Sequence, residues 1–230
     1  ISRGLVGSEM CIRDRLKTRY TGYLKRHVPT VGASPQFNIP EDPFILITAG
    51  GGGDGEGLME WVLRAYEYDP DLPYPAVLVL GPFMSQEKQA EFLDRANRLD
   101  RVQAMTFDAR IENLMSKAAG MVSMGGYNTF CEILSFDKRA LIIPRTEPRL
   151  EQYIRAKRAE ELGLISMLVD NGDHDPKEMA KSLRKLPGQP RPSEILPTDI
   201  LGGLPQVNRL ARRWLRKSRD LRNIPVRQRA

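Results

Sequence analysis

The chain has 230 residues, of which 41% are apolar, so it is long enough to form one domain with a sizeable core. No run of eighteen apolar residues or signal-peptide pattern occurs, so no membrane span is expected. The chain has only two cysteines, Cys11 and Cys131, which excludes a disulfide framework and a cysteine-based metal site and favours a reduced, cytoplasmic setting. Its two histidines, His27 and His174, are too far apart in the sequence to have metal-ligand spacing.

The net charge of +6 belongs to one end of the chain. Residues 205–230 contain nine Arg or Lys against Asp220 alone, a sum of +8, so the other 204 residues sum to −2. The basic character is therefore a property of a C-terminal tail and not of the rest of the chain.

The first fifteen residues, ISRGLVGSEMCIRDR, have no amphipathic period and resemble translated sequencing-adapter sequence. We expect residues 1–15 to be non-native and the natural protein to continue upstream.

From Phe44 onward, short apolar runs alternate with segments of helical period. The six runs, each typical of a buried strand, are 44–49, 76–81, 101–106, 120–124, 139–144 and 164–169. Ser85 is suited to cap one intervening helix, and Asp175, Pro176 and Glu178 have the spacing of a capping box at the start of the last. This alternation predicts an α/β fold, a doubly wound, parallel six-stranded sheet of Rossmann-like type, over residues 44–186.

After residue 186 the composition changes to Pro and Gly, which predicts a linker over 187–204. A basic amphipathic helix is expected in 205–230, where Val207, Leu210, Trp214 and Leu221 share one stripe.

Ligands of doubly wound sheets bind beyond the carboxyl ends of the strands, which singles out two glycine-rich loops. The first directly follows the first predicted strand and includes Gly51, Gly52, Gly53 and Asp54. Glycines let a backbone approach a phosphate closely, although a merely flexible strand-to-helix turn has the same composition.

The second loop, after the fourth predicted strand, is Gly125-Gly126-Tyr127-Asn128-Thr129. Two glycines at a helix start present N–H donors to a phosphate. Glu132, about one turn later, is placed to accept hydrogen bonds from the two hydroxyls of a ribose, or is an ordinary surface glutamate.

The motifs VSMGGYNTFCEIL and RTEPRLEQYIRA resemble the C-terminal domain of glycosyltransferase family 28, and most closely a bacterial group of predicted glycosyltransferases. The likeness runs from about Phe44 to Leu186, and residues 16–43 look like the end of a preceding domain and a linker, with KTRYTGYLKR as strand and linker. The resemblance implies one half of a two-domain GT-B fold.

The resemblance also implies roles for single residues. Phe107 and Asp108 fall where the family holds the base, residues 125–129 on its diphosphate-binding turn, and Glu132 on its ribose-binding glutamate. Glu151 and Gln152 fall on a pair that binds the donor sugar and is usually two glutamines, so Glu151 is a departure.

The resemblance implies an inverting transfer of a sugar from a nucleoside-diphosphate sugar. The expected donor is a UDP-linked hexose or N-acetylhexosamine. No catalytic residue is assigned here, because the family's base and acceptor site belong to an N-terminal domain. No metal or cofactor is expected, because the family stabilises the leaving diphosphate by helix dipoles and N–H groups, and no DxD-like pair directly follows a predicted strand. A nucleotide-sugar hydrolase, a 2-epimerase and a non-catalytic donor-binding subunit with a membrane partner are alternatives. The fragment alone is expected to be inactive.

The basic tail has two main interpretations. It packs on the N-terminal domain, as the last helix of GT-B enzymes does, or it lies on an anionic membrane surface. Nucleic acid is not an expected partner, because the basic residues of the tail are not interleaved with aromatic residues.

Overall fold

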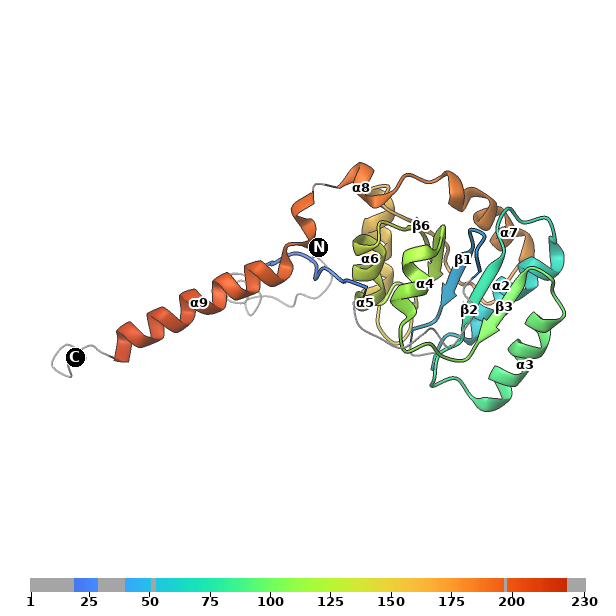
Figure 1. Cartoon of the computed structure of the whole chain (residues 1–230), viewed down its shortest axis with the longest axis horizontal. Helices are drawn as coiled ribbons and strands as arrows, with labels where there is room; N and C mark the ends of the chain where they lie inside the picture. The colour runs from blue at the N-terminus through green and yellow to red at the C-terminus, as the bar shows by residue number, and fades with distance from the viewer. Residues whose placement is uncertain (1–18, 29–39, 51–52, 197, 223–230) are drawn as a thin grey trace. The chain divides into compact units, whose positions relative to one another are not determined.

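Six parallel strands form the centre of residues 26–196 in the computed structural model (Figure 1). The structure describes residues 19–28, 40–50, 53–196 and 198–222, so the prediction for residues 1–15 lies outside the described part. Two compact units are present, residues 26–196 and residues 1–25 with 197–230, and each is described by itself.

All six predicted strands are present, each shorter than its apolar run. They are β1 (Ile45–Thr48), β2 (Ala76–Val79), β3 (Val102–Met105), β4 (Gly120–Ser123), β5 (Arg139–Ile142) and β6 (Ser166–Met167). The helices between and after them are α2 (Glu56–Tyr68), α3 (Gln86–Asn97), α4 (Ile111–Lys117), α5 (Tyr127–Ser135), α6 (Glu151–Glu161) and α7 (Pro176–Lys185).

The strand order is β3-β2-β1-β4-β5-β6, with every pair parallel. The chain winds outward from β1 through β2 to β3, then returns to β4 and winds outward the other way. This topology places α2 and α7, which pack on each other, on one face and α4, α5 and α6 on the other (Figure 1). The predicted doubly wound parallel sheet is confirmed.

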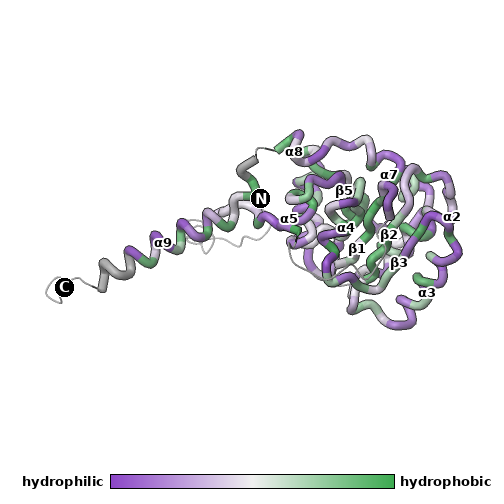
Figure 2. The backbone as a smooth tube through the Cα atoms, viewed as in Figure 1, coloured by the Kyte–Doolittle hydropathy of each residue, from purple (hydrophilic) through white to green (hydrophobic). Residues whose placement is uncertain are grey.

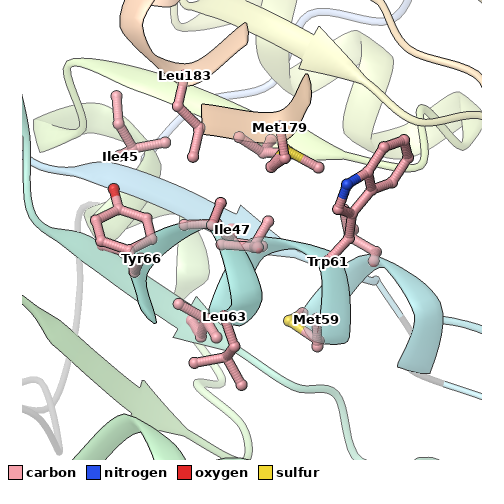
Figure 3. Close-up of a cluster of buried hydrophobic side chains, with 14 of the residues drawn as sticks. Ile45, Ile47, Met59, Trp61, Leu63, Tyr66, Met179 and Leu183 are labelled. Carbon is pink, nitrogen blue, oxygen red and sulfur yellow. The ribbon is translucent and has the colours of Figure 1, made fainter. Parts of the chain in front are cut away.

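The strands are buried on both faces, which explains their unbroken apolar sequences. Ile45 and Ile47 point to the face covered by α2 and α7, where Trp61 and Met179 join the same cluster (Figure 3). Leu46, between them, is fully buried outside that cluster. In the hydropathy colouring, the central strands stand out as apolar among helices with polar outer sides (Figure 2).

Two predicted helix caps are present. Ser85 Oγ accepts a hydrogen bond from Lys88 N at 3.3 Å at the start of α3. Asp175 Oδ1 accepts from Lys177 N at 3.0 Å at the start of α7, with Pro176 as the first helical residue. The cap of α7 therefore bonds the second helical N–H rather than the third, which a capping box would use.

The Pro- and Gly-rich stretch contains short helical elements: η1 (Leu186–Gly188), α8 (Pro192–Ile195) and η2 (Thr198–Leu201). Ser193 Oγ hydrogen-bonds to Asp137 Oδ2 at 2.8 Å, so α8 is tied to the turn before β5.

The other unit contains helix α9 (Gly203–Arg222), within the segment where the C-terminal helix was expected, of which residues 223–230 lie outside the described part. Ahead of it, Leu24 and Gly202 form an isolated antiparallel bridge, and Tyr23 N donates to Ile200 O at 2.8 Å. A strand was expected within residues 17–26. Residues 19–26 are described, and the only strand-type pairing among them is this bridge. Trp214 is 60% exposed.

Candidate functional site

The two predicted glycine loops leave the sheet side by side. β1 and β4 are neighbours, and their last residues, Thr48 and Ser123, are paired in register. From these strands the chain winds away in opposite directions, so the loops bound the topological switch point of the sheet, where ligands of such folds bind.

The two turns at this point have the same construction. Thr48 Oγ1 accepts a hydrogen bond from Gly50 N at 3.2 Å, and Ser123 Oγ accepts one from Gly125 N at 3.3 Å. Both glycines have left-handed backbones, with φ of +68° and +70°. Each turn folds its chain sharply away from the strand end.

At position 125 a glycine is also required for steric reasons, whereas position 126 has room for a larger side chain. A Cβ on Gly125 would lie 2.7 Å from Cγ2 of the buried Ile142, whereas a Cβ on Gly126 would meet nothing within 4 Å. Gly126 is the N-cap of α5 and makes no side-chain cap. The positive end of the α5 dipole is therefore directed at the switch point.

A cavity of about 450 Å³ lies over these turns, a size typical of small-ligand sites. Its lining includes the whole predicted segment from Gly125 to Thr129, together with Asp54 and Gln152. The complete lining is Thr48, Ala49, Gly50, Asp54, Met124, Gly125, Gly126, Tyr127, Asn128, Thr129, Arg145 and Gln152.

A second cavity of about 410 Å³ adjoins the first and shares Asp54, Met124 and Arg145 with it. It continues past Thr146 and Glu147, in the loop after β5, to Asp170 and Gly172 after β6; Gly57, Leu58, Ile143 and Pro144 also line it.

Two arginines that the sequence analysis did not single out contribute to the site. Arg145 forms an ion pair with Asp54, and its backbone N–H donates to Oε1 of the buried Gln152 at 3.1 Å. Arg155 Nη1 donates to Gly125 O at 2.9 Å, and its guanidinium lies 5.9 Å from the centre of the Tyr127 ring. The switch-point rule, extended to the loop after β5, would have drawn attention to Arg145.

Glu132 is buried within α5, with 8% of its surface exposed. Arg26 Nε lies 3.9 Å from its carboxylate. Burial raises the pKa of the Glu132 carboxyl above its ordinary value, and the charge of Arg26 opposes that rise only in part. Glu132 is not in the lining of either cavity.

The structure does not bring all predicted residues to the cavities. Glu151 is exposed at the start of α6, and Phe107 is 54% exposed after β3. Asp108 Oδ1 accepts from Arg110 N at 2.7 Å within its own loop. None of these three lines either cavity. Gly53 is exposed, and Gly51 and Gly52 lie outside the described residues.

A doubly wound sheet with a ligand-sized cavity at its switch point defines a Rossmann-like binding domain. Residues 45–193 match the glycosyltransferase family 28 C-terminal domain, and the chain belongs to this family. The predicted family is thereby confirmed. No curated protein matches the sequence.

Solved glycosyltransferase structures share this fold. The glycotransferase of kitacinnamycin is 17% identical, with a TM-score of 0.57 over 80% of this chain and 47% of its own. The spinosyn forosaminyltransferase SpnP is 16% identical (TM-score 0.54, 81% and 49%), and the calicheamicin glycosyltransferase CalG4 is 17% identical (TM-score 0.53, 73% and 38%). The chain thus spans less than half of each, and the prediction of one half of a GT-B fold is confirmed.

Proposed function

We propose that this chain is the donor-binding half of an inverting glycosyltransferase that uses a nucleoside-diphosphate sugar, with UDP-linked hexose or N-acetylhexosamine as the expected donor. The observation that carries the proposal is the 450 Å³ cavity, where two matched glycine turns meet the uncapped N-terminus of α5. Backbone N–H groups at a helix start and the positive end of the helix dipole are suited to a diphosphate. The acceptor would be held by a second domain.

The proposed donor lies along the carboxyl edge of the sheet. Its diphosphate lies on the turn of residues 125–129 at the start of α5, and its sugar reaches Gln152. Glu132, on the second turn of α5, accepts hydrogen bonds from the ribose hydroxyls, because a carboxylate offers two acceptor oxygens to a diol. Phe107 and Asp108 hold the base, and the exposed Phe107 ring offers it an apolar face.

Calorimetry on the 230-residue chain with UDP, dTDP, GDP and ADP tests this proposal. We expect weak binding of at least one nucleoside diphosphate and no sugar transfer. No heat of binding for any of them at millimolar concentration would contradict the proposal.

The same preparation separates the alternative functions. Release of free UDP from a UDP-sugar without acceptor would indicate a hydrolase, and formation of a different UDP-sugar a 2-epimerase. Binding with neither reaction fits both a donor half and a non-catalytic donor subunit. Transfer on addition of a candidate partner domain or membrane subunit would distinguish these two.

We also propose that α9 lies on an anionic membrane surface, at the cytoplasmic face. Within Gly203–Arg222 seven residues are basic and only Asp220 is acidic. At 100° per residue, Val207, Leu210 and Trp214 fall on one side and Arg209, Arg212, Arg213 and Arg216 on the other. Along α9 the hydropathy colouring alternates accordingly (Figure 2). None of the helices in the described part is long and apolar enough to cross a bilayer. An apolar face beside a cationic one is typical of helices that lie in the lipid interface.

Co-sedimentation with vesicles tests the membrane proposal. Vesicles with an anionic phospholipid should bind the chain at low salt, and high salt or deletion of residues 205–230 should abolish binding. Vesicles of neutral phosphatidylcholine are the control. Absence of binding at low salt would contradict the proposal and favour packing of α9 on a protein domain.

A further inference from the structure

Arg145 occupies the boundary between the two cavities of the candidate site. It is the third residue after β5, and its backbone N–H bonds to Gln152 Oε1 at 3.1 Å, which fastens its loop to α6. Its guanidinium reaches Asp54, 91 residues away in the first glycine loop. Both residues line both cavities.

The guanidinium of Arg145 is incompletely satisfied in this arrangement. Its Nη1 hydrogen-bonds to Asp54 Oδ2, while its Nε is buried with no hydrogen-bond partner. Buried polar groups nearly always have partners, and an unsatisfied donor on a side chain that lines a cavity indicates a group that another acceptor completes. A phosphate offers acceptor oxygens to two N–H groups of one guanidinium at the same time.

The charged residues that line the larger cavity also favour a diphosphate as its ligand. Among its described lining residues, Arg145 is the one cation and Asp54 the one carboxylate. A diphosphate placed on the turn at Gly125 would be attracted by Arg145 and repelled by Asp54. The diphosphate and Asp54 therefore compete for the same guanidinium. Arg155 is engaged elsewhere, because its Nη1 donates to Gly125 O, a carbonyl of the turn itself.

We propose that Arg145 binds the donor diphosphate, and that Asp54 is its counter-ion in the ligand-free protein, which the diphosphate displaces. This inference rests on the proposed donor-binding function. Asp54 accordingly competes with the ligand rather than holding it, whereas position in the first glycine loop alone made Asp54 a candidate ligand residue.

The test is binding of the nucleoside diphosphate that the wild type binds best among UDP, dTDP, GDP and ADP, alongside the matching nucleoside. Arg145→Met should weaken binding of the diphosphate roughly ten- to a hundredfold, the range for a lost charge-assisted hydrogen bond. Asp54→Asn should strengthen it about two- to fivefold, because a partly exposed competing ion pair is removed. Neither change should alter affinity for the nucleoside.

The ion pair of Asp69 and Arg184 provides matched controls. It carries the same two charges, with Arg184 Nε and Nη2 bonding to Asp69 at 2.9 and 2.7 Å. Asp69 follows the end of α2 and Arg184 is in the last turn of α7, so this pair lies at the amino edge of the sheet, away from the cavities. Asp69→Asn and Arg184→Met should leave the affinity for the diphosphate unchanged.

The outcomes separate this inference from the proposed function. If the wild type binds none of the four nucleotides, the proposed function fails, and the inference with it. If it binds but a folded Arg145→Met variant retains full affinity, or Asp54→Asn weakens binding, the inference alone is wrong. If Arg145→Met does not fold, Arg145→Lys and Asp54→Asn provide the test. The lysine variant should bind the diphosphate less tightly, because an ammonium group lacks the planar fork of a guanidinium. Unchanged affinity for the diphosphate in both variants would overturn the inference.

Discussion

Gly125 and Gly126 are adjacent glycines with different structural requirements. Gly125 combines a left-handed backbone with a direct approach to Ile142, whereas Gly126 has an ordinary φ of −54° and open space where a Cβ would be. Substitutions at these two positions can therefore separate what the fold requires from what a ligand requires.

Gly125→Ala should destabilise the domain by about 2–4 kcal/mol, because a left-handed alanine costs about 1–2 kcal/mol and overpacking adds a similar amount. Gly126→Ala should fold almost normally and yet weaken binding of a nucleoside diphosphate, since its methyl group would enter the space over the α5 N-terminus. Thermal melts and calorimetry on both variants test this. Equal stability of the two variants would contradict the steric argument.

Glu132 carries a cost in stability that its proposed role explains. Folding raises the pKa of its carboxyl through burial, so the protonated form is favoured in the folded state. Its contribution to stability is complete below the ordinary pKa of glutamate and is lost as the pH rises through the raised value. At neutral pH the ionised side chain therefore destabilises the fold.

Glu132→Gln should consequently raise the melting temperature near pH 7, and the gain should shrink toward about pH 4, where the wild-type carboxyl becomes protonated. The same variant should bind nucleoside diphosphate roughly ten- to a hundredfold more weakly, because an amide replaces a charged acceptor. Glu151→Gln, at an exposed position, is the control for loss of a carboxylate. A lower melting temperature of Glu132→Gln at pH 7 would indicate that the contact with Arg26 outweighs burial.

Among the helices, α7 shows how a local signal and tertiary packing combine. Its N-cap Asp175 was recognisable from sequence, but its packing against α2 was not. Trp61 Nε1, on α2, donates to the Asp175 carbonyl at 2.7 Å, so one residue both starts α7 and joins the two helices.

Asp175→Ala should lower the stability of the domain by about 1 kcal/mol, the usual loss for an N-cap side chain. That corresponds to about 2–4 °C in melting temperature for a protein of this size. Ser85→Ala, which removes the longer 3.3 Å cap of α3, should cost less, since α3 buries only Phe92 and Ala96. A larger loss from Ser85→Ala would contradict this ranking.

Helix α9 is expected to contribute little to the free energy of unfolding of the whole molecule. Leu204, Trp214 and Leu215 on α9 are 58%, 60% and 65% exposed, so they bury little apolar surface. The charge of the tail is also opposite to that of the remaining chain.

Deletion of residues 205–230 should therefore cost no more than about 1 kcal/mol, as is usual for poorly packed termini. Differential scanning calorimetry of the shortened and full chains measures this. A fall of several degrees in melting temperature would show that α9 packs on the sheet domain in solution.

The alternation of strands and helices, the two glycine loops and the separate basic helix could be predicted from the sequence, because hydrophobic period, glycine clusters and charge runs are local properties. Tertiary structure decided which distant residues meet. The strand order makes Thr48 and Ser123 neighbours, and the phase of α6 directs Gln152, and not Glu151, to the cavity. The pair of Asp54 and Arg145 spans 91 residues. The strand-end rule indicates which edge of the sheet such loops share, but which side chains pair there depends on the strand order and on the path of each loop, which no local pattern gives.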